Sequence, residues 1–446
     1  MTQKFSLLLV LAFIAGTYKV QSQINCANDS TGFISLVDLQ SDYQVLSGSL
    51  FQGGLYPGGS NLIPPAHKAA GMSISKSIKP LDEFGNIDWI DGKVVLAAFG
   101  ASTAGEPFNH FTDDVQAADG LNPCMKLVTS TNGGKGLDIM QSPDLYPFYW
   151  EDVLARIDSA GLTPEQIQIG WFKSGSKSDV AVEMPTMANA LADEYTNCLQ
   201  VLLDFFPNLK MVYITGFYYG GYGDSTKEFY DVISEPGGLY NNYGAKFLIE
   251  RQISGDPELK FSVPERKSPW IAWGPHEWAD GERANEWDGL EWICETDYSV
   301  DGGGYHMTNA GKEKESELLM HFFKHNPTTK RWFRDNPKWN SCDPFGRLSD
   351  GRDLNYNDPD EIKEQSINLY PSPNDGNFYL RFMNAITGHA DIVVVNNMGQ
   401  KVYTNTIDGF KPSQGIQIEI TGVPAGIYYV NVNIDGKLLS KEFIIY

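Results

Sequence analysis

Between residues 93 and 323, short apolar runs alternate with segments of helical period. The runs 93–99, 166–172 and 210–215 have the length and apolarity of strands that are buried on both faces. Apolar residues recur at helical intervals in the segments between and after them, at 149–160, 187–206, 243–253 and 310–323. Strands that alternate with helices form a parallel sheet covered on both faces. The sequence therefore predicts an α/β fold, a three-layer sandwich around a central parallel sheet.

The two ends of the chain depart from this pattern. Residues 1–22 contain an early lysine, an apolar run at 5–16 and small residues before a cleavage site, so we expect a signal peptide and no membrane-spanning segment once it is removed. The α/β domain is then expected to cover residues 23–333, with a loop-rich N-terminal part at 24–90. Residues 334–366 are rich in Asp, Asn, Pro and Gly and indicate an acidic linker. Short strands between turns predict a small all-β sandwich at residues 367–446.

Charge and cysteine content exclude several classes of function. The formal net charge is −22, which argues against nucleic acid and anionic lipid as partners. The five cysteines are widely spaced without a CxxC pair, so a zinc cluster is not expected. In an exported chain they allow one or two disulfides and leave at least one thiol unpaired within a monomer. We expect neither a cofactor nor a metal.

The linker contains part of a calcium-loop pattern. Asp353, Asn355, Asn357 and Glu364 fall at ligand positions of a calcium loop, but Asp358 and Pro359 oppose its tight turn. A solvated acidic linker is the preferred interpretation.

Candidate catalytic residues follow the first predicted strand of the α/β domain and precede its last predicted helix. In α/β sheets, reactive side chains lie beyond the carboxyl ends of the strands. Ser102 follows the first predicted strand, and Asp301 and His306 precede the last predicted helix. A serine becomes nucleophilic beside a base, and an aspartate that holds Nδ1 of a histidine leaves Nε2 free to take the serine proton. The alternatives are a turn serine, a histidine at the start of a helix and an aspartate that caps a turn.

An early Gly-x-Ser after the first strand, with a late Asp…His before the last helix, resembles the SGNH/GDSL hydrolases. The resemblance covers residues ~90–335 and is closest to an extracellular SGNH-like branch, whose blocks match at 168–173, 206–213 and 270–281. It implies an SGNH/flavodoxin-like fold and ester hydrolysis through an acyl-serine. It also implies catalytic Ser102, His306 and Asp301, with oxyanion donors from Ser102, Gly136 and Lys173 and with Gly134 close behind. For Lys173 the alternative is a solvated or salt-bridged lysine. A second Gly-Asp-Ser, ending at Ser225, follows the third strand and is interpreted as a turn.

This chain departs from the family pattern at three points. The usual Gly-Asp-Ser is Gly-Ala-Ser, ending at Ser102. Two extra residues separate Asp301 from His306, and the asparagine of the third block is absent, with Lys173 at that strand end. These departures favour the alternative hypothesis, a catalytically degenerate SGNH-fold protein that binds glycans at the cell surface.

The C-terminal region carries three spaced motifs, at 370–378, 397–402 and 424–430. Together they resemble the C-terminal sorting domain of proteins exported by the bacterial type IX secretion route. The resemblance implies the type IX machinery as a partner and a secreted or cell-surface location, so the substrate must lie outside the cell. Acylated polysaccharide, such as one that carries acetyl esters, or a small ester is then the expected substrate. Trp273 and Trp278, in a tryptophan-dense segment, are candidate residues for binding it, with core packing as the alternative.

Overall fold

The structure is a computed structural model of the whole chain, which divides into two compact units, residues 1–349 and 350–446. The described residues are 24–178, 180–224, 232–299 and 303–335 in the first unit. In the second they are 367–370, 374, 376–382, 386–410, 416–434 and 437–445. The expected signal peptide, the linker from residue 336 onward and the calcium pattern within it lie outside these ranges. Each unit is described by itself.

The first unit is built on a five-stranded parallel sheet with the strand order β4-β3-β5-β6-β7. The first of these strands in the chain, β3, therefore lies between the second and the third. At such a switch point the loops that follow neighbouring strands diverge, which opens a crevice at the carboxyl edge of the sheet. The strands are β3 (Val94–Gly100), β4 (Met125–Thr129), β5 (Ile167–Lys173), β6 (Met211–Ile214) and β7 (Trp270–Trp273).

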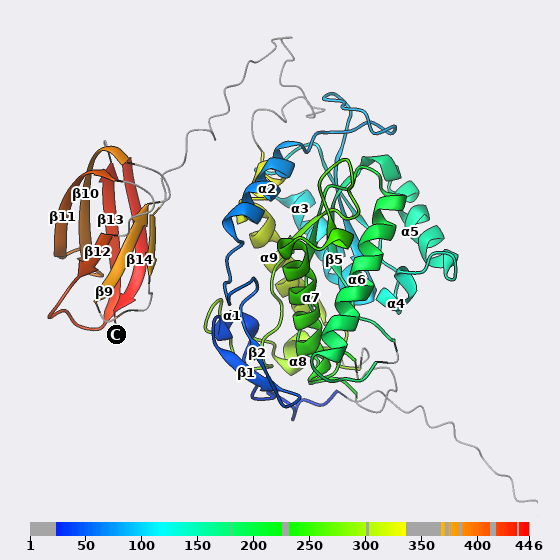
Figure 1. The fold of residues 1–446 in the computed structure, drawn as a ribbon, viewed down its shortest axis with the longest axis horizontal. Coiled ribbons are helices and arrows are strands. Elements are labelled where there is room, and N and C mark those ends of the chain that lie inside the picture. The colour runs from blue at the N-terminus through cyan, green and yellow to red at the C-terminus, as the bar shows by residue number, and fades with distance from the viewer. Residues whose placement is uncertain are drawn as a thin grey trace, which may run out of the picture. The chain divides into compact units, whose positions relative to one another are not determined.

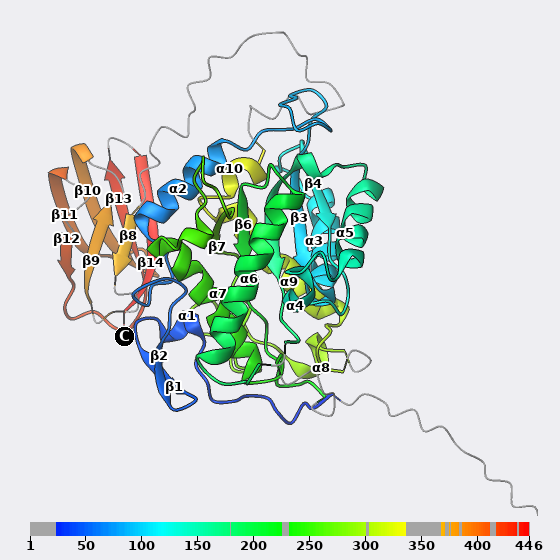
Figure 2. The same ribbon diagram turned by 45° about the vertical axis from the view of Figure 1, so that its right-hand side comes forward.

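Helices cover both faces of this sheet (Figures 1 and 2). Every residue of β3 is buried, and alternate residues contribute to two separate cores: Val94 and Leu96 to one, Val95 and Ala97 to the other. This explains the unbroken apolar run in the sequence. The first core is shared with α2 (Pro65–Lys76), α3 (Ser102–Ala117), α9 (Asn309–His325) and α10 (Lys330–Phe333), and the second with α5 (Pro147–Ser159), α6 (Thr186–Phe205) and α7 (Gly237–Ser254). The predicted parallel sheet with helices on both faces is confirmed.

Several elements were not predicted from the sequence. Strand β4 lies at the edge of the sheet and has only Val128 fully buried, so it shows no apolar run. Helix α3 contains Gly105 and Pro107, both of which disfavour a helix interior. The loop-rich N-terminal part holds α2 and an antiparallel hairpin. The remaining elements of the first unit are α1 (Leu36–Leu39), β1 (Tyr43–Leu46), β2 (Ser49–Gln52), α4 (Leu137–Met140), η1 (Pro164–Gln166), η2 (Pro257–Leu259) and α8 (Cys294–Asp297).

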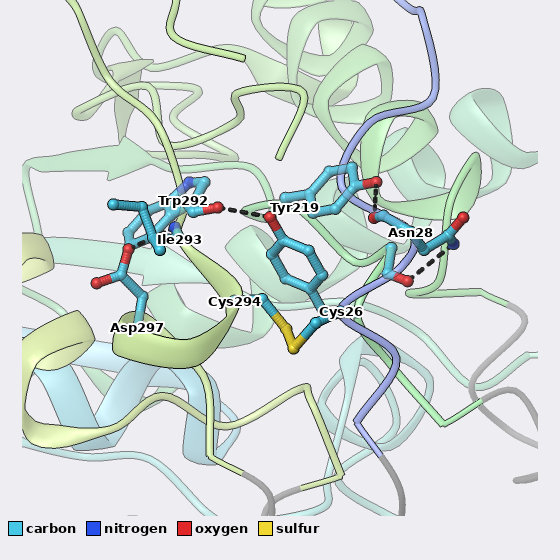
Figure 3. Close-up of a disulfide and its surroundings, with 9 residues drawn as sticks. Cys26, Asn28, Tyr219, Trp292, Ile293, Cys294 and Asp297 are labelled. Atoms are coloured by element: carbon cyan, nitrogen blue, oxygen red, sulfur yellow. Dashed lines mark hydrogen bonds between the residues drawn. A yellow bond between two sulfur atoms is a disulfide. The ribbon is translucent and has the colours of Figure 1, made fainter. Parts of the chain in front are cut away.

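A disulfide links the N-terminal segment to the start of α8. Cys26 and Cys294 are 268 residues apart in sequence, and their Cα atoms are 5.5 Å apart (Figure 3). Nearby, the Tyr219 hydroxyl donates to the carbonyl oxygen of Asn28 at 2.7 Å, which adds a second link to the same segment. Cys124 is also disulfide-bonded, and Cys198 is a buried free thiol, so the expectation of one unpaired thiol is confirmed.

The second unit consists of two antiparallel sheets, as predicted. A four-stranded sheet has the order β11-β10-β13-β14, and a three-stranded sheet has the order β12-β9-β8. Alternate residues of both sheets, among them Phe378, Ile392 and Val430, form one buried core, and the rings of Phe378 and Phe443 join the two sheets. The strands are β8 (Ile367–Tyr370), β9 (Asn377–Phe382), β10 (Ile386–Asn396), β11 (Lys401–Phe410), β12 (Ile416–Glu419), β13 (Gly426–Ile434) and β14 (Lys437–Ile445).

Candidate functional site

A cavity of about 280 Å³ lies where the loops after β3, β4, β5 and β6 meet the loop before α9. It is therefore at the carboxyl edge of the sheet, beside the switch point. The residues that line it include Ser102, Gly134, Gly136 and His306, so four of the residues singled out from the sequence come together. Other lining residues are Lys135, Ser176, Lys177, Phe217 and Tyr305.

The backbone before Ser102 explains the Gly-Ala-Ser sequence. Gly100 has φ of 131°, and a Cβ atom there would lie 2.0 Å from the carbonyl oxygen of Lys173, so only glycine fits. The chain then turns directly into α3, with Ser102 as the first helical residue. Its N-cap is Ala101, whose side chain caps no N–H group. Among the described residues, no group accepts a hydrogen bond from the N–H of Ser102 or Thr103, the first two of this 16-residue helix. These two N–H groups therefore stay available at the cavity wall, together with the positive end of the helix dipole.

Gly136 is placed by a close contact with the loop after β5. A Cβ atom at this position would lie 2.6 Å from the carbonyl oxygen of Gly175. The neighbouring N–H of Leu137 donates to the same oxygen at 2.9 Å. Within the described part of the chain, no group accepts a hydrogen bond from the N–H of Gly136. That N–H can therefore serve a ligand.

His306 is held by a carboxylate that the sequence analysis missed. Its Nδ1 lies 2.8 Å from Oε1 of Glu106, and Oε2 of Glu106 lies 2.9 Å from Nζ of Lys312. Burial raises the pKa of Glu106, but the hydrogen bonds and charges of His306 and Lys312 outweigh it and hold that pKa below its usual value. An ionised carboxylate only accepts hydrogen bonds, so Nδ1 of His306 carries a proton, and Nε2 is the ring nitrogen left to face a substrate.

Glu106 follows Ser102 by four residues on α3, so both lie on the same face of one helix. The sequence contains this pair as Ser-x-x-x-Glu, but the spacing indicates a shared face only if the segment is recognised as a helix, and α3 was not predicted. Both Ser102 and His306 line the cavity, and no hydrogen bond joins their side chains among the described residues. Asp301, the expected partner of His306, and Ser225 lie outside the described residues.

Lys173 is not available as an oxyanion donor. It is fully buried, and its Nζ lies 2.6 Å from Glu277 and 2.7 Å from Glu315. It follows Trp171 by two residues, so it points to the face covered by α9, which carries Glu315. Burial and the nearby charge of Glu315 raise the pKa of Glu277 well above its usual value, although Lys173 opposes this. The family-based expectation for Lys173 is therefore corrected.

The two tryptophans expected to bind substrate belong to the core. Trp273 is 2% exposed and Trp278 is fully buried. Their indole N–H groups donate to the Leu55 carbonyl oxygen at 2.6 Å and to Oε1 of Glu235 at 2.9 Å. The alternative of core packing is thus correct for both. His276, in the same segment, is also buried, and burial lowers its pKa to about 4.

Comparisons with known proteins identify the second unit. Residues 368–446 match the family described as "Secretion system C-terminal sorting domain". They are a sorting domain of the type IX route. The protein is therefore exported through that machinery to the cell surface or the extracellular space, as its sequence predicted. Among the described residues, no helix has the length and apolarity needed to cross a bilayer.

The other comparisons say little about the first unit. No curated protein matches the chain at a significant level. PorZ, a surface component of the type IX secretion system of Porphyromonas gingivalis, is 14% identical with a TM-score of 0.16, over 19% of this chain and 12% of its own. An endo-beta-1,4-mannanase from Thermotoga petrophila is 11% identical with a TM-score of 0.23, over 79% and 78% of the two chains. A Cellulomonas fimi endo-beta-1,4-mannanase double mutant is 9% identical with a TM-score of 0.19, over 93% and 100%. Likenesses at this level carry no argument about fold or function.

Proposed function

We propose that the first unit is a secreted serine esterase of SGNH type that hydrolyses acyl esters on extracellular polysaccharide. The observation that carries the proposal is one cavity that contains Ser102, His306 and Gly136, with Glu106 at Nδ1 of the imidazole. A hydroxyl, a base, an acid that orients the base and a backbone N–H are the parts that acyl transfer requires.

In the proposed reaction, Ser102 Oγ attacks the ester carbonyl carbon while Nε2 of His306 takes its proton. The alkoxide leaves with that proton, which produces an acyl-serine and a free alcohol. Water then attacks the acyl-serine by the same route and releases the carboxylic acid. Glu106 stabilises the imidazolium that exists during each transfer, in place of the aspartate that the family pattern implied.

The charge that develops on the carbonyl oxygen requires donors. The N–H groups of Gly136 and of the start of α3 are the available candidates, each worth roughly 3 kcal/mol in the transition state. Both belong to backbone fixed by close contacts at Gly100 and Gly136, so they need little reorganisation. Lys173 takes no part in this proposal.

The SGNH assignment is supported by the strand order, by the serine after the first strand of the sheet and by the histidine before its last long helix. Export supports a substrate outside the cell. The buried tryptophans no longer support a sugar platform, so the polysaccharide assignment rests on location and on the cavity itself.

A fluorophosphonate probe tests the proposal, because it labels only an activated serine. We expect the purified full chain to be labelled and to release 4-nitrophenol from 4-nitrophenyl acetate, and Ser102→Ala to lose both activities. Ser176→Ala, in the same cavity but with its hydroxyl bonded to Ser178 and not to a histidine, is the matched control and should still be labelled. Absence of labelling in the folded wild type, together with retained polysaccharide binding, would instead support the glycan-binding alternative.

A further inference from the structure

The described lining of the cavity carries a charge opposite to that of the chain. The protein has 56 acidic and 34 basic residues, yet among the described residues that line this cavity are Lys135 and Lys177 and no aspartate or glutamate. The start of α3 adds the partial positive charge of the helix dipole at Ser102. A neutral ester needs no such lining, whereas an anionic one must overcome the repulsion of the whole molecule.

The two lysines have different surroundings. Nζ of Lys177 donates to the carbonyl oxygen of Gly134 at 3.0 Å, so it helps to hold the loop that carries Gly136. Nζ of Lys135 lies 5.3 Å from the ring centroid of Phe148. A cation over an aromatic ring is held weakly, and the contact uses none of its three N–H donors. Lys135 can therefore bind an anionic oxygen without breaking a strong contact.

Phe148 makes the surroundings of Lys135 suitable for a sugar. Phe148 is 44% exposed, so it is only partly covered by the protein. Aromatic rings pack against the apolar face of sugar rings, and the ammonium group would meet a charged substituent on the same ring. The Phe148 ring lies next to Lys135, which lines the cavity, whereas Trp273 and Trp278 are buried in the core and line no part of it.

From these contacts we infer that the ester is carried by an anionic polysaccharide, with Lys135 binding the charged group next to the scissile bond. The inference rests on the proposed esterase function. It differs from a role of Lys135 at the oxyanion, because the oxyanion forms with every ester. Loss of an oxyanion donor lowers kcat for all substrates, whereas loss of a contact with substrate charge affects the charged one selectively.

The test compares acetylated polygalacturonate, which is anionic, with acetylated xylan, which is neutral, in the wild type and in Lys135→Met. We expect the ratio of kcat/KM for the anionic over the neutral substrate to fall about tenfold, which corresponds to about 1.4 kcal/mol. Lys126→Met removes an exposed lysine of β4 that does not line the cavity, and should leave the ratio as in the wild type. An equal loss on both substrates, or an unchanged ratio, would overturn the inference.

A binding measurement separates this inference from the esterase proposal. Ser102→Ala should bind polygalacturonate, and Ser102→Ala/Lys135→Met should bind it about tenfold more weakly, with the difference reduced by added salt. That result supports the inference even if the wild type hydrolyses no ester, an outcome that would refute only the esterase proposal. Equal affinity of the two variants would refute the inference even in an active esterase.

Discussion

Replacing Glu106 by glutamine removes the negative charge beside His306 and keeps the size of the side chain. Oε1 of Glu106 lies 2.8 Å from Nδ1 of His306. With about 4 Å between charge centres and an effective dielectric constant of about 20, the attraction between carboxylate and imidazolium is about 4 kcal/mol. Because each side chain is 34% exposed, solvent screens part of this attraction. We expect about 2 kcal/mol to remain.

The loss should fall on kcat, because the imidazolium exists only after His306 has taken the proton of Ser102. About 2 kcal/mol corresponds to a kcat about 30-fold lower, with little change in KM. Initial rates of 4-nitrophenyl acetate hydrolysis over a range of concentrations measure both constants. Glu313→Gln, which removes an exposed carboxylate of α9 next to Lys312, is the control and should behave as the wild type. A kcat for Glu106→Gln within about twofold of the wild type would refute the reasoning.

Two further predictions concern buried charge. Burial raises the pKa of Glu235 from 4.5 to about 7, so the folded state favours the protonated carboxyl. The resulting contribution to the free energy of unfolding is fully present below pH 4.5 and is lost as the pH rises through about 7. The difference corresponds to about 3 kcal/mol, and urea unfolding at pH 5 and pH 8 should show a smaller loss of stability in Glu235→Gln than in the wild type. Lys173→Met leaves Glu277 and Glu315 buried without their cation and should lower the free energy of unfolding by about 3–5 kcal/mol. Unfolding at pH 7 measures this, and a change below about 1 kcal/mol would show that the ion pairs matter little.

The sequence predicted the parts of the sheet that are buried on both faces and missed the strands at its two edges. Strands β3 and β5 are fully buried, so their apolar runs were distinctive. Edge strand β4 carries a mixture of exposed and buried residues, which hides its signal. Strand β7 at the other edge is a buried apolar run as long as β6 and was nevertheless missed. Helix α3 was missed because Gly105 and Pro107 weaken the helical signal.

The same reasoning explains what was found of the site. Ser102, Gly136 and His306 lie at the carboxyl edge of the sheet, which strand order in the sequence can indicate. The role of Glu106 could not be predicted, because helix α3, which carries it on the same face as Ser102, was not predicted. Lys173 and Trp273 were misjudged because residue type alone does not reveal burial: the lysine is enclosed by two carboxylates and the tryptophan by the core.

The Cys26–Cys294 bond has a consequence for producing the protein. It joins Cys26, near the start of the described chain, to Cys294, which precedes His306 by twelve residues. Thiols stay reduced in the bacterial cytoplasm, whereas the periplasm oxidises them. A chain made in a reducing cytoplasm would lack this tether, so the loop that carries the imidazole would reach its final rigidity only after export.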